Sequence, residues 1–122
     1  MRIIYVEDDA ANIALIERLC QMNQDELTTY PDADSALAGI QPEIADLILM
    51  DIQLDGRGLN GLQLARLLRQ KGVVAPIVAI TAYDTMGYGE EYLRAGCEQY
   101  IRKPVSVTEM LSLINNYRDL AR

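Results

Sequence analysis

The chain has 122 residues, of which 50% are hydrophobic and 24% are charged, so we expect one globular domain that spans residues 1–122. Its formal net charge of −7 disfavours direct binding of nucleic acid, because such binding needs a basic surface that neutralises phosphates. No apolar run is as long as a membrane span and no signal peptide precedes the first expected strand, so we expect a cytoplasmic protein without membrane insertion.

The first half of the chain predicts two strands and two helices in alternation. Residues 3–6 form the first expected strand, and apolar residues at helical spacing predict a helix over about 11–23. Residues 27–30 are rich in β-branched side chains and predict a strand at the edge of a sheet. Asp32 is expected to cap a second helix, which ends before Pro42.

The second half of the chain continues this alternation. Further strands are expected at three apolar runs, which are residues 47–51, 77–80 and 100–101. We expect a third helix between Asn60 and Gly72, a fourth over 90–95, and a fifth that begins at the capping box of Ser106 and Glu109. Five strands alternating with five helices predict a doubly wound α/β fold, with the uncharged strands one, three and four in the middle of a parallel sheet.

Polar residues follow four of the expected strands. They are Glu7, Asp8 and Asp9 after the first, Asp51 at the end of the third, Thr81 after the fourth and Lys103 after the fifth. Because ligands of such folds bind at the carboxyl ends of the strands, we expect these side chains to share one site. The carboxylates of Glu7, Asp8 and Asp51, in a chain that contains no His, favour Mg²⁺. A cation, an ammonium group and a hydroxyl around Asp51 suit phosphoryl transfer, with Asp51 forming an acyl phosphate.

These motifs resemble the receiver domains of bacterial two-component response regulators. The segments that carry the resemblance are Val6-Glu7-Asp8-Asp9, Met50-Asp51-Ile52-Gln53, Ile80-Thr81-Ala82 and Lys103-Pro104, and the similarity extends over essentially the whole chain. The resemblance implies a flavodoxin-like fold, with five helices and a five-stranded parallel sheet in the order 2-1-3-4-5. It also implies that Asp51 takes its phosphoryl group from a phosphohistidine of a sensor histidine kinase or of a histidine phosphotransfer protein.

The resemblance further implies roles for individual residues around Asp51. Asp8 would bind Mg²⁺ directly, Glu7 mainly through water, and Gln53 with its backbone carbonyl, while Asp51 completes the metal site. Lys103 would pair with phosphate oxygens and would precede a cis Pro104. The implied chemistry is Mg²⁺-dependent self-phosphorylation and self-dephosphorylation rather than enzymatic turnover.

A switch and a partner surface are also expected. The resemblance implies that Thr81 turns inward to bond the phosphoryl group and that Tyr100 moves with it. It places Gln53 and Tyr83 beside the path of the attacking water, and from these side chains we expect slow self-dephosphorylation. We expect a downstream partner or a homodimer to use the fourth helix, the last strand and the fifth helix, including Tyr88, Tyr92, Tyr100 and Arg102.

Two features depart from the family pattern, and two other functions remain open. Asp55 stands where the family usually has proline, and the loop over 53–59 is about two residues longer than is typical. One alternative is a phosphatase that uses Asp51 as nucleophile with the same metal and lysine, although Gln53 stands where such enzymes have a second acid. The other is a receiver-like binding module that is never phosphorylated.

Overall fold

The computed structural model describes residues 1–51, 59–81 and 89–120, in which five strands and five helices alternate. The strands are β1 (Arg2–Val6), β2 (Glu26–Tyr30), β3 (Leu47–Asp51), β4 (Ile77–Thr81) and β5 (Gln99–Arg102). The helices are α1 (Ala10–Met22), α2 (Ala33–Gly39), α3 (Gly61–Gln70), α4 (Gly89–Arg94) and α5 (Val107–Leu120). These ranges confirm the predicted elements, with shifts of about one or two residues at their ends.

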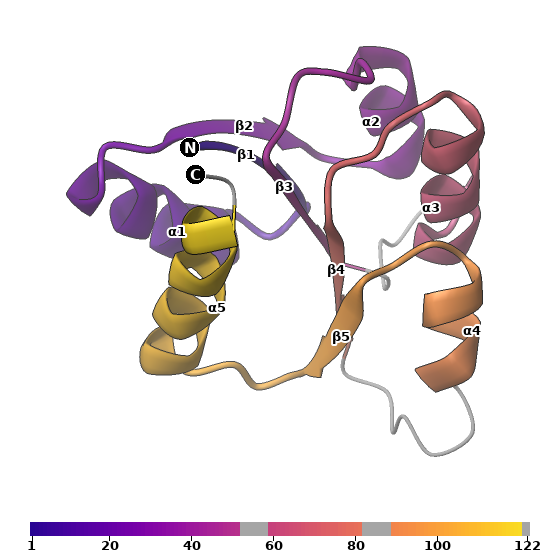
Figure 1. Ribbon diagram of the computed structural model, residues 1–122. Coiled ribbons are helices and arrows are strands. Elements are labelled where there is room, and N and C mark those ends of the chain that lie inside the picture. Colours follow the sequence, from indigo (N-terminus) through magenta and orange to yellow (C-terminus); the bar gives the residue numbers. More distant parts are fainter. Residues whose placement is uncertain (52–58, 82–88, 121–122) are drawn as a thin grey trace.

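The strands form one parallel sheet in the order β2-β1-β3-β4-β5, which confirms the predicted topology (Figure 1). The central strands β1, β3 and β4 are buried almost throughout, whereas β2 and β5 lie at the edges. The register pairs Val6 with Met50, Asp51 with Ile80 and Thr81 with Arg102. The polar residues that end these strands therefore meet at one edge of the sheet.

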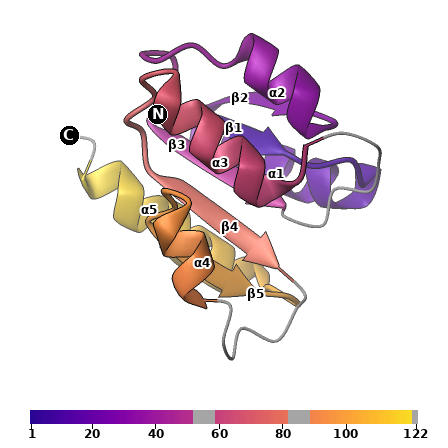
Figure 2. The same ribbon diagram turned by 90° about the vertical axis from the view of Figure 1, so that its right-hand side faces the viewer.

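Helices cover both faces of the sheet. Figure 2 shows α2, α3 and α4 on the near face, with α1 and α5 on the far face. Along β3 the side chains alternate between the two faces: Ile48 and Met50 pack in the core under α2 and α3, and Leu47 and Leu49 pack in the core under α1 and α5. No helix within the described ranges is long and apolar enough to cross a membrane.

Local signals set several helix ends as the sequence predicts. The Asp32 side chain accepts a hydrogen bond from the backbone N–H of Ser35 at 2.7 Å and so caps α2. Asn60 and Gln63 bond to each other's backbone N–H groups in a capping box that starts α3. Gly72, with φ of +100°, follows α3 in the left-handed conformation that glycine adopts without strain.

The Arg69 side chain ties together the segments that lead into β4 and β5. Its guanidinium donates hydrogen bonds of 2.8 to 3.0 Å to the carbonyl oxygens of Val73, Ala75 and Gly96. A Cβ atom on Gly96 would lie 2.7 Å from the Arg69 Cγ atom, and Gly96 has a φ of +109°. Both the left-handed backbone and the close approach therefore require glycine at this position, which the sequence predicts only as the end of a helix.

A buried ion pair joins the start of β2 to the end of α5. The Asp25 side chain is 1% exposed and accepts two hydrogen bonds from the Arg118 guanidinium, one of them at 2.8 Å, and one from the Met1 amine at 3.2 Å. Burial alone would raise the pKa of Asp25, but the bonds from Arg118 and the amine hold this pKa below its usual value. The charged form of Asp25 therefore stabilises the folded state.

The Asp25→Asn substitution should lower the free energy of unfolding at pH 7 by about 3 kcal/mol, because it leaves the Arg118 guanidinium without its anion. Asp25 has a lower pKa in the folded than in the unfolded state. Its contribution is therefore complete above a pH of about 4 and is lost as the pH falls through the folded-state pKa. Urea unfolding at a series of pH values should show the gap between wild type and variant closing on acidification. Asp119→Asn, on the exposed side of α5, is the matched control, and a gap that does not change with pH would contradict the assignment.

Candidate functional site

Asp51 and Lys103 form an ion pair at the carboxyl edge of the sheet. Asp51 ends β3 and is 4% exposed, and the Lys103 ammonium donates a hydrogen bond of 2.6 Å to its Oδ2 atom. Lys103 follows β5 and precedes a cis peptide bond to Pro104, as predicted, and its backbone N–H bonds the Thr81 carbonyl at 2.7 Å. Burial opposes the charge of Lys103, but the bond to Asp51 raises its pKa, so the ammonium is a fixed positive charge.

Glu7 lies beside Asp51 and is itself buried, with 1% exposure. Its carboxylate accepts hydrogen bonds of 3.1 Å from the backbone N–H groups of Asp8 and Asp9 and from the Tyr5 hydroxyl. Burial raises the pKa of Glu7, and so does its hydrogen bond with the Asp51 carboxyl group. Two carboxylates in such contact disfavour double ionisation, so this part of the site attracts positive charge. The role of Tyr5 in holding Glu7 is absent from the sequence prediction.

Three of the four predicted metal ligands lie at the carboxyl edge of the sheet. Glu7 and Asp51 are in contact, and Asp8 lies next to them with an exposed side chain. Within the described ranges, no three His, Cys, Asp or Glu side chains already lie together as ligands for a metal ion. Gln53, whose carbonyl is the fourth predicted ligand, lies outside the described residues. The donors that are described are all carboxylate oxygens, which fit a hard divalent cation such as Mg²⁺.

Thr81 and Tyr100 are joined through a third residue, Tyr92. Thr81 is fully buried, and the Tyr92 hydroxyl donates a hydrogen bond of 3.4 Å to its Oγ1 atom. The rings of Tyr92 and Tyr100 pack with their centroids 5.5 Å apart. The prediction that Tyr92 belongs to the partner surface is wrong, because this side chain is 4% exposed and packs in the core on the α4 side of the sheet.

Besides Gln53, three further residues with predicted roles lie outside the described residues. They are Asp55, Tyr83 and Tyr88. The role of Tyr83 in dephosphorylation and the effect of Asp55 on the metal site therefore stay predictions.

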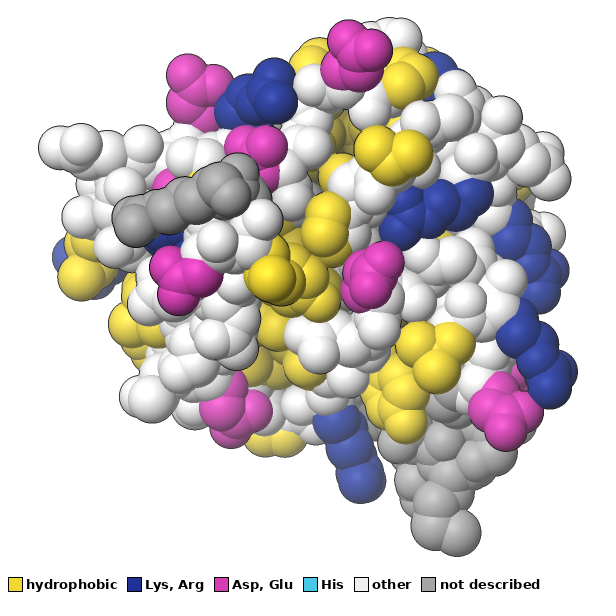
Figure 3. Space-filling model, viewed as in Figure 1, with side chains coloured by type: hydrophobic (Ala, Val, Ile, Leu, Met, Phe, Trp, Pro, Cys, Tyr) yellow, Lys and Arg dark blue, Asp and Glu magenta, His cyan; other side chains and the backbone are white. Residues whose placement is uncertain are grey.

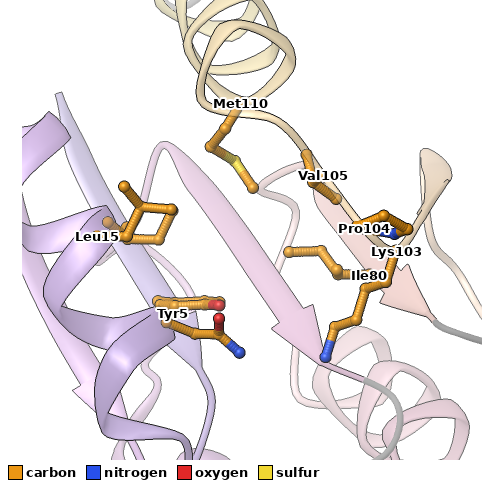
Figure 4. A pocket seen from close by; sticks show the side chains of 9 residues that line it. Tyr5, Leu15, Ile80, Lys103, Pro104, Val105 and Met110 are labelled. Carbon is orange, nitrogen blue, oxygen red and sulfur yellow. The ribbon is translucent and has the colours of Figure 1, made fainter.

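A pocket of about 430 Å³ flanks the ion pair (Figure 4). Tyr5 and Leu15 lie on its β1 and α1 side, and Lys103 reaches across from the other side with its ammonium directed away from the apolar wall. That wall is formed by Ile16, Ile80, Pro104, Val105 and Met110. A mostly apolar hollow therefore leads to the edge of the charged site.

A second hollow, of about 400 Å³, lies at the opposite edge of the sheet. It is bordered by the starts of β3 and β4 and by the end of α5, where Val74 and Leu120 are strongly exposed. Apolar side chains gather near the middle of the face shown in Figure 3. Among the described residues, the lining of this second hollow includes acids but neither Lys nor Arg, whereas the Asp51 edge pairs an ammonium group with a carboxylate.

The chain is similar to known proteins over nearly its whole length. The family model of the response regulator receiver domain matches residues 3–115. The chain is 32% identical to the polar-differentiation response regulator DivK of Brucella anthropi over 94% of each protein. It is 30% identical to the sensor histidine kinase GacS of Pseudomonas protegens over 98% of this chain. The matched part makes up only 13% of the length of that kinase. The BeF3-activated receiver domain of Klebsiella pneumoniae RstA has a TM-score of 0.84 and 30% identity, and the match covers 96% of this chain and 97% of that one.

Glu7→Gln should stabilise the metal-free protein at neutral pH, within the range of about 0.5–2 kcal/mol usual for stabilising substitutions, because it removes one of two buried carboxylates in contact. The folded-state pKa of Glu7 is raised, so wild type loses stability as the pH rises from about 4.3, the usual value for Glu, toward that raised pKa. The neutral amide has no such loss. Thermal unfolding in a chelator across pH 4 to 8 measures the difference, with the exposed Glu17→Gln on α1 as control. Parallel pH profiles for wild type and Glu7→Gln would refute the explanation.

Proposed function

This chain belongs to the response regulator receiver domain family of two-component signalling, and from that premise we propose that it accepts a phosphoryl group on Asp51 in the cytoplasm. The donor is a phosphohistidine of a sensor histidine kinase or of a histidine phosphotransfer protein. The observation that carries the proposal is the buried Asp51 carboxylate with the Lys103 ammonium 2.6 Å away, next to Glu7. A nucleophile and a fixed cation in surroundings that exclude water suit the transfer of an anionic phosphoryl group.

The proposed reaction exchanges one bond to phosphorus for another. An Asp51 carboxylate oxygen attacks the phosphorus, and a P–O bond forms as the P–N bond to the donor histidine breaks. The electron pair of the broken bond leaves with the imidazole nitrogen. Lys103 balances the negative charge of the transferred oxygens, and the Thr81 hydroxyl donates a hydrogen bond to one of them once it turns toward Asp51. The apolar pocket beside Lys103 supports an approach of the donor from the α1 side.

We also propose Mg²⁺ as the cofactor. The ligands would be Glu7, Asp8, Asp51 and the backbone carbonyl of Gln53, all oxygen donors. When bound, the cation neutralises the phosphoryl oxygens and the carboxylates around them. The contact of the buried Glu7 and Asp51 carboxyl groups supports this assignment, because a cation between them would offset their repulsion.

The partner surface in this proposal is the face made by α4, β5 and α5. Arg102 on β5 is exposed, and so are the apolar side chains of Leu93 on α4 and Val107 on α5. Tyr100 is half-buried between this surface and Tyr92, so a movement of its ring would change the surface. A face that combines apolar and basic side chains suits a downstream protein or a second copy of the chain.

Asp51→Asn should fold normally and take no phosphoryl group from acetyl phosphate in the presence of Mg²⁺, because the amide has nearly the same shape but is not nucleophilic. Intact mass should show one added phosphoryl group on wild type and none on the variant, with the exposed Asp34→Asn as control. Labelling of Asp51→Asn at the wild-type level would place the acceptor elsewhere. Release of inorganic phosphate in many turnovers without labelled protein would indicate the phosphatase alternative, and neither label nor turnover would indicate the binding module.

Mg²⁺ should raise the melting temperature of wild type, since it binds the folded carboxylate site and not the dispersed acids of the unfolded chain. At ten times its Kd the gain is about 1.4 kcal/mol, which corresponds to a shift of roughly 3 to 6 °C for a domain of this size. Asp8→Ala should abolish the shift. Sodium chloride at equal ionic strength controls for screening, and an equal shift in wild type and Asp8→Ala would contradict the ligand assignment.

A further inference from the structure

Alternation along the strands sets Thr81 and Asp51 on opposite sides of the sheet. In β4, Ile77 and Ala79 belong to the core under α2, α3 and α4, and Thr81 continues their series. In β3, Leu49 belongs to the core under α1 and α5, and Asp51 continues that other series. The Thr81 hydroxyl therefore starts from the α4 side and must turn around the end of its strand to meet a phosphoryl group on Asp51.

On the α4 side, the partner of Thr81 is Tyr92. The hydrogen bond from the Tyr92 hydroxyl to Thr81 Oγ1 is 3.4 Å long, and both side chains are almost completely buried. Hydroxyl pairs usually bond at 2.7 to 2.8 Å, so this bond is weak. A bond from Thr81 to an anionic phosphoryl oxygen would be shorter and roughly twice as strong as one between neutral groups. Thr81 can therefore exchange one partner for the other.

We infer that Tyr92 is the positioning residue that couples Thr81 to helix α4 in the phosphorylation switch. The Tyr92 hydroxyl restrains Thr81 before phosphorylation, and it loses its acceptor when Thr81 turns to the phosphoryl group. A buried hydroxyl without a partner is unfavourable, so Tyr92 shifts to regain one. Because Tyr92 is part of α4 and its ring packs against Tyr100, the helix and the Tyr100 ring shift with it.

This inference rests on the proposed function. It predicts that one substitution raises the rate of phosphorylation and weakens the response of helix α4. Tyr92→Phe keeps the ring and its contact with Tyr100 but removes the hydroxyl. Since the restraint on Thr81 is gone, the variant should accept a phosphoryl group from acetyl phosphate about twofold faster than wild type, the factor that a hydrogen bond at the weak end of the usual range represents. Since the link to α4 is gone as well, the helix should respond less to phosphorylation.

The experiment compares wild type, Tyr92→Phe and Tyr117→Phe, in which a hydroxyl is removed from the distant α5. Intact mass follows phosphorylation by acetyl phosphate with Mg²⁺, and amide hydrogen exchange of residues 89–96 is measured before and after phosphorylation at matched occupancy. We expect faster phosphorylation together with a loss of more than half of the exchange change in Tyr92→Phe, and wild-type behaviour in Tyr117→Phe. If Tyr92→Phe matches Tyr117→Phe in either measurement, the coupling role is wrong.

A second substitution tests whether Tyr92 acts through Thr81. In a Thr81→Val background the acceptor is missing, so adding Tyr92→Phe should change neither the phosphorylation rate nor the exchange of α4. A full effect of Tyr92→Phe in that background would overturn the inference. Failure of the proposed function can be distinguished from failure of this inference. In that case wild type would not be phosphorylated by acetyl phosphate, or Asp51→Asn would be phosphorylated as well.

Discussion

The contact of two buried carboxylates, Glu7 and Asp51, is the constraint around which the rest of this fold is arranged. Their repulsion opposes folding, and the protein offsets it with the Lys103 ammonium on Asp51 and with three hydrogen bonds to Glu7. Within the described ranges, Lys103 is the one cation that bonds either of these two carboxylates, so the compensation is incomplete. The site is therefore most favourable when further positive charge relieves the repulsion, which ties the same groups to stability and, in the proposed function, to Mg²⁺ binding.

The parallel sheet brings these groups together at one edge. Because β1 lies beside β3 and β4 beside β5, residues far apart in the chain end at the same edge: Glu7, Asp51, Thr81 and Lys103. Their side chains also depend on register, since a slip of one residue along a strand would carry each of them to the other face of the sheet. The continuous apolar packing of β1, β3 and β4 on both faces fixes that register, so the core determines which polar atoms meet.

Much of this could be predicted from the sequence, and the exceptions share a physical cause. Strand ends, helix caps and the stop at Gly72 depend on residues close in the chain, and the structure confirms them. The Asp25–Arg118 pair joins residues 93 positions apart, which leaves no trace in any local pattern. Tyr92 was misassigned to the surface for a related reason. Helix α4 has only six residues, too few for a periodic pattern to show which of its side chains face the core.

The two edges of the sheet differ in how firmly they are held, and the proposed switch lies at the weaker one. Two groups of short hydrogen bonds hold the edge where the strands begin. Arg118 bonds the buried carboxylate of Asp25, and the Arg69 guanidinium bonds backbone carbonyl oxygens. At the edge where the strands end, the Thr81–Tyr92 bond is long and the carboxylates repel each other. In the proposed switch, phosphorylation of Asp51 therefore acts at the edge where these interactions are weak or unfavourable, and a few kcal/mol of differential interaction are enough to exchange two conformational populations. The firm opposite edge keeps the sheet folded while, in the proposed switch, α4 shifts above it.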